Sequence, residues 1–139
     1  MELNKTIYET EMQVRPDDID MFQHVHSAKY IDYVLAARYD QMERCYGNPM
    51  QEYIEKGLGW VVNSCTINFK RALKLGDKML TRTQLESVEN TSVRVNFSII
   101  NKATQKTCSD GHFDYTLIDL KSGRAQLIPE WVLERYSLT

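Results

Sequence analysis

The residues best suited to chemistry lie between Val14 and Ser27, in the sequence VRPDDIDMFQHVHS. This stretch holds three aspartates and two histidines, and it runs directly into a predicted helix. The first turn of a helix has backbone N–H groups without partners inside the helix, and it carries the positive end of the helix dipole. Carboxylates and imidazoles beside such donors are the components of an acyl-transfer or hydrolysis site.

A helix that could position these groups is predicted from about Ala28 to Cys45. Its polar residues form one narrow stripe, and most of the remaining circumference is apolar. The stripe consists of Lys29, Asp32, Ala36, Asp40 and Glu43. A helix with so little polar surface needs a broad, concave partner, and a curved sheet is the natural one. Gly47 and Pro49 are expected to end the helix.

Strand patterns account for most of the remaining chain. Strands are predicted at Thr6–Val14, Trp60–Arg71, Met79–Val88, Val93–Ile99 and His112–Leu120, with a short one near Ala125–Leu127. A helical turn is expected within Met50–Gly57, and Pro129 opens a last short helix. Consecutive strands joined by short hairpins pair antiparallel. The order predicts a single α+β domain over residues 1–139, with one antiparallel sheet and one central helix packed on its face.

The composition excludes several classes of protein. With 139 residues, 42% hydrophobic and 26% charged, the chain is typical of one globular domain with a real core. The net charge of -2 gives no reason to expect a nucleic-acid partner. No apolar run approaches the ~20 residues that span a membrane. The start of the chain lacks the apolar core of a secretory signal, so a cytoplasmic protein without membrane partners is expected.

The cysteines indicate neither disulfides nor a zinc site. Cys45, Cys65 and Cys108 are odd in number and widely spaced. Reduced thiols in a cytosolic protein are the simplest interpretation. No spacing typical of metal ligands is present, so no metal and no cofactor are expected.

Two segments resemble a known family. Residues 18–33, DIDMFQHVHSAKYIDY, followed by Ala37-Arg38, resemble the signature of hotdog-fold thioesterases of the 4-hydroxybenzoyl-CoA thioesterase type. That signature runs roughly D-x-D-x-F-G-H-V-N-N-x-x-Y-x-x-Y, followed by A-R. Trp60–Ser64 and Phe69–Asp77 resemble the second strand and the R-P-x-x-x-G-D turn of that family. The resemblance covers about Thr6 to Leu120 and implies a hotdog fold, in which an antiparallel sheet wraps around one long central helix.

The resemblance also implies acyl-CoA thioesterase activity and assigns roles. Asp20 matches the catalytic carboxylate, acting as nucleophile or as general base for water, although aspartates in loops often cap turns. His24 matches the motif histidine, which binds the thioester oxygen, orients the carboxylate or merely packs. Ser27 stands where a backbone N–H forms the oxyanion hole, or it serves as an N-cap. Asp18, the first motif aspartate, is expected to be structural.

The remaining implications concern substrate and partners. Lys70, Arg71 and Lys74 precede the Gly76-Asp77 turn, where they could attract the phosphates of coenzyme A or form a solvated strand end. Members of the family are homodimers or homotetramers, with sheets paired edge to edge and the active site at the dimer interface. The expected function is therefore hydrolysis of a fatty or aryl acyl-CoA in lipid metabolism.

The same residues also fit two other functions. The chain could be a non-catalytic module that binds acyl thioesters, or a thioesterase acting on acyl carrier protein. The motif also resembles that of plant acyl-carrier-protein thioesterases, but Phe22 replaces their asparagine. Gln23 replaces the usual glycine of the hotdog signature.

Overall fold

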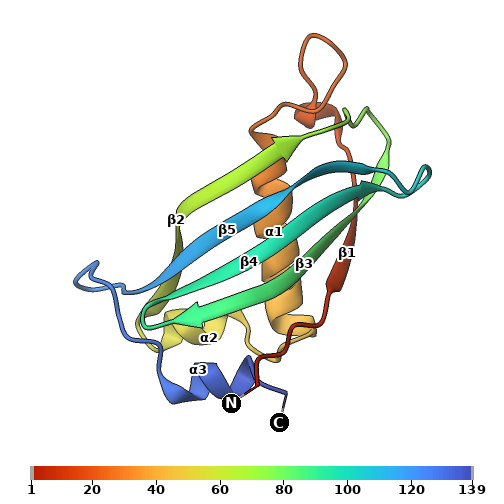
Figure 1. Cartoon of the computed structure of the whole chain (residues 1–139). Helices are drawn as coiled ribbons and strands as arrows, with labels where there is room; N and C mark the ends of the chain where they lie inside the picture. Colours follow the sequence, from red (N-terminus) through yellow and green to blue (C-terminus); the bar gives the residue numbers. More distant parts are fainter. Residues whose placement is uncertain (1, 139) are drawn as a thin grey trace.

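The computed structural model describes residues 2–138, and its five strands form one antiparallel sheet. In chain order the elements are β1 (Tyr8–Gln13), η1 (Pro16–Asp18), α1 (Lys29–Arg44), α2 (Met50–Glu55), β2 (Leu58–Phe69), β3 (Lys78–Glu89), β4 (Ser92–Asn101), β5 (Thr107–Asp119) and α3 (Glu130–Arg135). Helix α1 packs on one face of the sheet, mainly against β1 and β3 (Figure 1). The prediction of an α+β fold is confirmed.

Alternation of apolar and polar residues directs one face of the central strands into the core. On β4, Val93, Val95 and Phe97 are buried, whereas the polar residues between them are only half-buried. Strands β3 and β4 pair antiparallel, as do β4 and β5. This is the arrangement that a period of two and short turns predict.

The position of β2 corrects the prediction that consecutive strands pair throughout. β2 pairs with β5 instead of β3, so the strand order is β1-β3-β4-β5-β2. The connection between β2 and β3 crosses the end of the sheet, and Leu73 within it is fully buried. Its backbone N–H donates to the hydroxyl of Tyr30 on α1 at 3.4 Å. An apolar anchor of this kind fixes a crossing connection where a hairpin was expected.

Two smaller expectations about the chain's end have different outcomes. The final helix after Pro129 is confirmed as α3. The short strand expected near Ala125–Leu127 is wrong, because Ala125 forms only an isolated bridge with Ile118 of β5. Helices α2 and α3 lie together at the end of the sheet away from the start of α1 (Figure 1).

Helix α1 lies within the predicted Ala28–Cys45 and has 16 residues. Its buried Gln41 amide donates to Thr10 Oγ1 on β1 at 3.0 Å and to the carbonyl of Thr81 on β3 at 3.3 Å. The opposite side of the helix is open, with Leu35 37% and Tyr39 55% exposed. The sheet of one chain therefore covers one side of a helix of moderate length instead of wrapping around a long one, because its edge strands β1 and β2 do not pair.

Candidate active site

The residues between β1 and α1 form a small hairpin that projects beyond the start of α1 (Figure 1). The N–H of Asp20 donates to the carbonyl of His24 at 2.8 Å, and the N–H of His26 donates to the carbonyl of Asp18 at 2.9 Å. Gln23 closes the turn with a φ of 68°, in the left-handed region that glycine favours. The hairpin thus explains why the family signature usually has glycine at this position.

Replacing Gln23 with glycine should stabilise the protein. A left-handed conformation costs a residue with a Cβ about 1–2 kcal/mol, and glycine loses about 0.5–1 kcal/mol through the flexibility of the unfolded chain. The expected net gain in the free energy of unfolding is about 0.5–1 kcal/mol, measurable by urea denaturation. The variant Gln23→Ala serves as control, because it keeps a Cβ and should bring no gain. A Gln23→Gly variant less stable than wild type would contradict the inferred strain.

The hairpin is attached to the crossing connection between β2 and β3. The N–H of Val25 donates to the carbonyl of Leu73 at 3.0 Å, and His24 forms an isolated backbone bridge with Lys74. Val25 and Leu73 are both buried. These contacts join the hairpin to the β2–β3 connection, so the two sequence motifs, about 50 residues apart in the chain, lie side by side in the fold.

Asp20 is held by its own turn through one carboxylate oxygen. Oδ1 accepts the N–H groups of Phe22 at 2.8 Å and His24 at 3.3 Å. Oδ2 accepts no hydrogen bond from residues 2–138. The side chain is therefore fixed in orientation, and it presents one unoccupied oxygen, as a nucleophile or a general base requires.

His24 does not orient this carboxylate with its imidazole. Its backbone N–H makes the contact with Asp20, whereas the ring is exposed and forms no hydrogen bond with the described residues. The ring of His26 is equally exposed and also lacks a hydrogen bond within residues 2–138. Of the roles expected for His24, contact between the ring and the Asp20 carboxylate is not observed, and the exposed ring is not packed in the core.

The start of α1 offers unpaired backbone donors. Ala28 is the N-cap residue, and no side chain caps the helix, so the alternative role of Ser27 as a side-chain cap is wrong. The N–H groups of Ser27 and Ala28 donate to no acceptor among the described residues. Both residues are exposed. These are the free amides that an oxyanion hole at a helix start requires.

Asp18 is structural, as expected. Its fully buried carboxylate accepts the hydroxyl of Tyr33 at 2.7 Å and the backbone N–H of Arg15 at 3.1 Å through Oδ2. The ammonium of Lys29 lies 3.8 Å from Oδ1. Burial acts to raise the pKa of Asp18, but these hydrogen bonds and cations outweigh it, and the pKa is below its ordinary value. An ionised Asp18 ties the base of the hairpin to α1.

Removing the Tyr33 hydroxyl should destabilise the protein in a pH-dependent way. A hydrogen bond to a buried carboxylate contributes about 1.5–3 kcal/mol, which Tyr33→Phe should lose at pH 7. The pKa of Asp18 is depressed in the folded state, so its contribution is present above the unfolded pKa and is lost as the pH falls. The loss caused by Tyr33→Phe should therefore shrink below about pH 4. Denaturation at pH 7 and pH 3 measures it, with exposed Tyr39→Phe as control, and an equal loss at both pH values would contradict it.

The three cations of the β2–β3 connection have different partners. Lys70 forms an ion pair with Asp110 at 2.7 Å, and Arg71 donates to the carbonyl of Thr107 at 3.1 Å. The ammonium of Lys74 meets no carboxylate within the described chain. Lys74 also lies beside the hairpin through its bridge with His24. Among the three, Lys74 is the cation that remains available to an anionic ligand.

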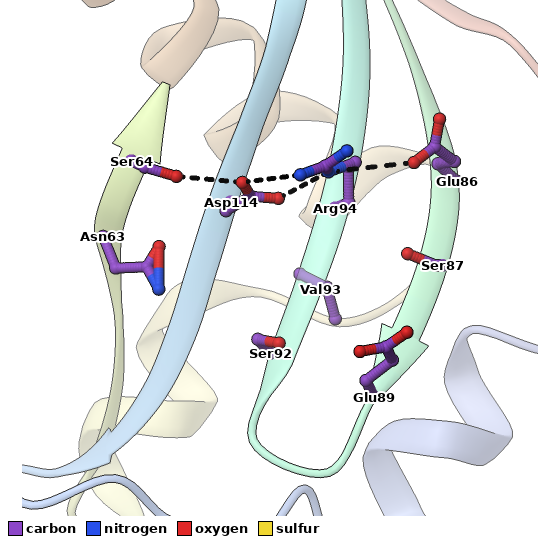
Figure 2. A pocket seen from close by; sticks show the side chains of 9 residues that line it. All are labelled: Asn63, Ser64, Glu86, Ser87, Glu89, Ser92, Val93, Arg94 and Asp114. Atoms are coloured by element: carbon purple, nitrogen blue, oxygen red, sulfur yellow. Dashed lines mark hydrogen bonds and ion pairs between the residues drawn. The ribbon is translucent and has the colours of Figure 1, made fainter. Parts of the chain in front are cut away.

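A polar hollow on the outer face of the sheet is separate from these residues. It has a volume of about 460 Å³ and is lined by side chains of β2, β3, β4 and β5 (Figure 2). Arg94 lies across it, bonding Asp114 at 2.8 and 3.1 Å and approaching Glu86 at 3.8 Å. The hydrogen bond from Arg94 lowers the pKa of Asp114 below its usual range. The ionised Asp114 carboxylate is therefore paired with the Arg94 guanidinium, and none of the expected site residues lines the hollow.

Two polar residues of α1, Tyr33 and Arg38, belong to the family motif but had no functional or structural role assigned from the sequence. Tyr33 is the hydrogen-bond partner of Asp18, and Arg38 is 3% exposed although no carboxylate among residues 2–138 pairs with it. Arg38 could have been noticed, because it lies off the polar stripe of the predicted helix. The role of Tyr33 depends on the fold, since 15 residues separate it from Asp18.

The chain is similar to known proteins over most of its length. The thioesterase-like superfamily model matches residues 14–136. The chain is 26% identical over 117 residues to the long-chain acyl-CoA thioesterase FadM of Escherichia coli (strain K12), covering 84% of this chain and 87% of that protein. Its structure is similar to that of DHNA-CoA thioesterase from Staphylococcus aureus, with a TM-score of 0.87, 18% identity, and coverage of 94% and 88% of the two chains. The probable thioesterase YbaW from Escherichia coli gives a TM-score of 0.78, 25% identity, and coverage of 91% and 94%.

Because the family model matches most of its length, the chain belongs to the thioesterase-like superfamily and is a hotdog-type thioesterase. The family resemblance inferred from the two sequence motifs is therefore confirmed. The prediction of an enzyme that hydrolyses thioesters is confirmed at the level of this family. None of the helices described between residues 2 and 138 is long and apolar enough to cross a membrane.

Proposed function

We propose that the protein hydrolyses acyl-CoA thioesters, with Asp20 as the catalytic carboxylate and the start of α1 as the oxyanion hole. The observation that carries this proposal is the hairpin of residues 18–26. It fixes Asp20 through Oδ1, leaves Oδ2 unoccupied and leads directly into the unpaired amides of Ser27 and Ala28. A carboxylate near free helix N–H groups can attack a thioester, or activate a water molecule that attacks it, while the amides stabilise the oxyanion.

The chemistry has two possible courses. As a nucleophile, Asp20 forms a mixed anhydride with the acyl group and releases the thiolate of coenzyme A, after which water hydrolyses the anhydride. As a general base, Asp20 takes a proton from water, which attacks the thioester carbon directly. In both courses the negative charge on the carbonyl oxygen develops toward the helix start. The exposed imidazole of His24 can donate to the same oxygen.

The substrate class follows from the relatives. The name of the relative at 26% identity specifies long-chain acyl-CoA, and the name of the structural neighbour at 18% identity specifies the aryl thioester DHNA-CoA. We favour fatty acyl-CoA because the similarity in sequence is greater. Hydrolysis of a panel of fatty and aryl acyl-CoAs, followed by detection of the free thiol, tests this choice. Binding of the acyl-CoAs without thiol release would favour a non-catalytic module that binds acyl thioesters. Hydrolysis of acyl thioesters of acyl carrier protein, but not of acyl-CoAs, would favour an acyl-carrier-protein thioesterase.

We also propose that two copies pair through β2. This edge strand has 12 residues, LGWVVNSCTINF, without one charged residue or proline. Its residues Val61 and Val62 are 40% and 38% exposed. The opposite edge, β1, has six residues and carries Glu9 and Glu11. Charges and brevity protect an edge strand from pairing, and β2 has neither protection. Two sheets joined there would extend the concave surface around both α1 helices, as the family resemblance implies.

Lys74 is proposed to bind a phosphate of coenzyme A. Its replacement with alanine should raise the KM for acyl-CoA by about 2–5-fold, the effect of losing one exposed charge pair of about 0.5–1 kcal/mol. The kcat should not change, because the phosphates are remote from the reacting carbonyl. The KM for the corresponding acyl-pantetheine, which lacks the phosphates, should also stay the same. Lys70→Ala is the matched control, since Lys70 is already paired with Asp110.

A further inference from the structure

Arg38 is a buried cation without an anion. It is 3% exposed, and no ion pair within residues 2–138 involves it. Its Nη2 donates to Met42 Sδ at 3.3 Å, and its guanidinium carbon lies 5.4 Å from the centre of the Tyr46 ring. Its Nη1 has no hydrogen-bond partner. A guanidinium stays charged in proteins, and burying a charge without a counter-ion is costly.

The free guanidinium nitrogen belongs to a side chain that lines a small, partly open pocket. The pocket has a volume of about 10 Å³, is partly open, and is lined by Arg38, Met42, Met50, Trp60, Val93, Tyr115 and Tyr136. The hydroxyl of Tyr115 also lacks a hydrogen-bond partner, and this residue is 5% exposed. The volume admits the centre of about one water-sized particle.

The chemistry of the pocket wall favours an anion over water. Arg38 supplies only donors, and Tyr115 can donate its proton. The one sulfur acceptor nearby, Met42 Sδ, already accepts bonds from Arg38 and from the Tyr136 hydroxyl at 3.0 Å. A water molecule there could accept from Arg38 and donate to the Tyr115 hydroxyl, but it would leave the charge of Arg38 uncompensated, whereas an anion would balance it.

The tyrosines cannot supply the missing negative charge. Burial raises the pKa of Tyr115 to about 12, even though the nearby guanidinium acts to lower it. Burial also raises the pKa of Tyr46, because its effect is larger than the opposite effect of the nearby Arg38 guanidinium. Both hydroxyls therefore remain protonated at neutral pH, and the charge of Arg38 remains uncompensated.

We propose that Arg38 and Tyr115 form a binding site for one small anionic group. Two sources could supply it: a free halide ion, or a carboxylate at the far end of an acyl chain. The second source rests on the proposed thioesterase function. Arg38 lies nine residues along α1 from its start, or about 13 Å, which a chain of about ten carbon atoms spans. A halide ion and a carboxylate are both larger than water, so either one requires a neighbouring side chain to move, and Met50, a flexible residue type that is only partly buried here, can yield that space.

The first experiment measures thermal unfolding in sodium chloride and in sodium gluconate at equal ionic strength. At a chloride concentration of about ten times the dissociation constant, the midpoint of wild type should rise by about 3–5 °C relative to gluconate. Arg38→Met should abolish this rise. Arg44→Met on the same helix is the matched control and should keep it, because Arg44 is exposed and pairs with Asp40. Tyr115→Phe, which removes one unbonded hydroxyl, should halve the rise even if Arg38→Met fails to fold.

The second experiment compares acyl-CoAs of ten carbons that end in a methyl group or in a carboxylate. If the acyl chain is the source, kcat/KM for the carboxylate should exceed that of the methyl form by about tenfold, and Arg38→Met should remove the preference. The chloride measurement needs no turnover, so it tests the site even if the proposed activity is absent. Equal midpoints in both salts together with no carboxylate preference would overturn the proposal, as would a chloride response that survives in Arg38→Met.

Discussion

Replacing Asp20 with asparagine should reduce kcat for acyl-CoA hydrolysis by about 10²–10⁴-fold, whichever of its two roles Asp20 has. Asparagine keeps an oxygen that can accept the N–H groups of Phe22 and His24, so the hairpin should retain its shape. It cannot act as a nucleophile or as a base. The KM should therefore change little, and steady-state kinetics with thiol detection separates the two constants.

The matched control is Asp17→Asn. Asp17 lies in the same segment, but its side chain is 71% exposed and only 3.8 Å from the guanidinium of Arg15. This variant should retain wild-type kcat. If Asp20→Asn also retained it, the assignment of the catalytic carboxylate would be wrong. Turnover in ¹⁸O-labelled water distinguishes the two courses, because only the nucleophilic course can place label in the Asp20 side chain.

Introducing a charge on the β2 edge should separate the proposed dimer. In Val62→Lys the ammonium would be desolvated between two paired edge strands, which is strongly unfavourable. Wild type should elute as a dimer in size-exclusion chromatography with light scattering, and the variant as a monomer. If the active site lies at the interface, kcat/KM should fall by about 100-fold or more, since loss of orientation alone costs that much.

The control for this variant lies on the opposite edge of the sheet. Ile7, just before β1, is 59% exposed, so Ile7→Lys adds the same charge to an exposed apolar position. It should remain dimeric and active. A monomeric wild type would contradict pairing through β2, and a fully active Val62→Lys monomer would contradict an active site shared between two copies.

The sequence by itself determined the local elements of this protein. Apolar residues alternate with polar ones in β4 and cover most of the circumference of α1. Such patterns depend only on neighbouring residues in the sequence, so they can be read without the fold. The two motifs likewise identified the family before any coordinates, because their residue types and spacing are specific. The left-handed turn at Gln23 was visible only as a departure from glycine in the motif.

Only the tertiary structure decided the relations between distant segments. The sequence placed β2 beside β3, but burial of Leu73 carries the connection across the sheet and makes β2 an edge. It could not show that the Tyr33 hydroxyl binds Asp18, or that Arg38 has no carboxylate within reach. Hydrogen bonds and ion pairs depend on distances of a few ångströms, and contacts between residues far apart in the chain are set by how whole elements pack. That is why the sequence could identify Asp20 as a candidate, whereas its free oxygen and the unpaired amides of α1 became visible only in the fold.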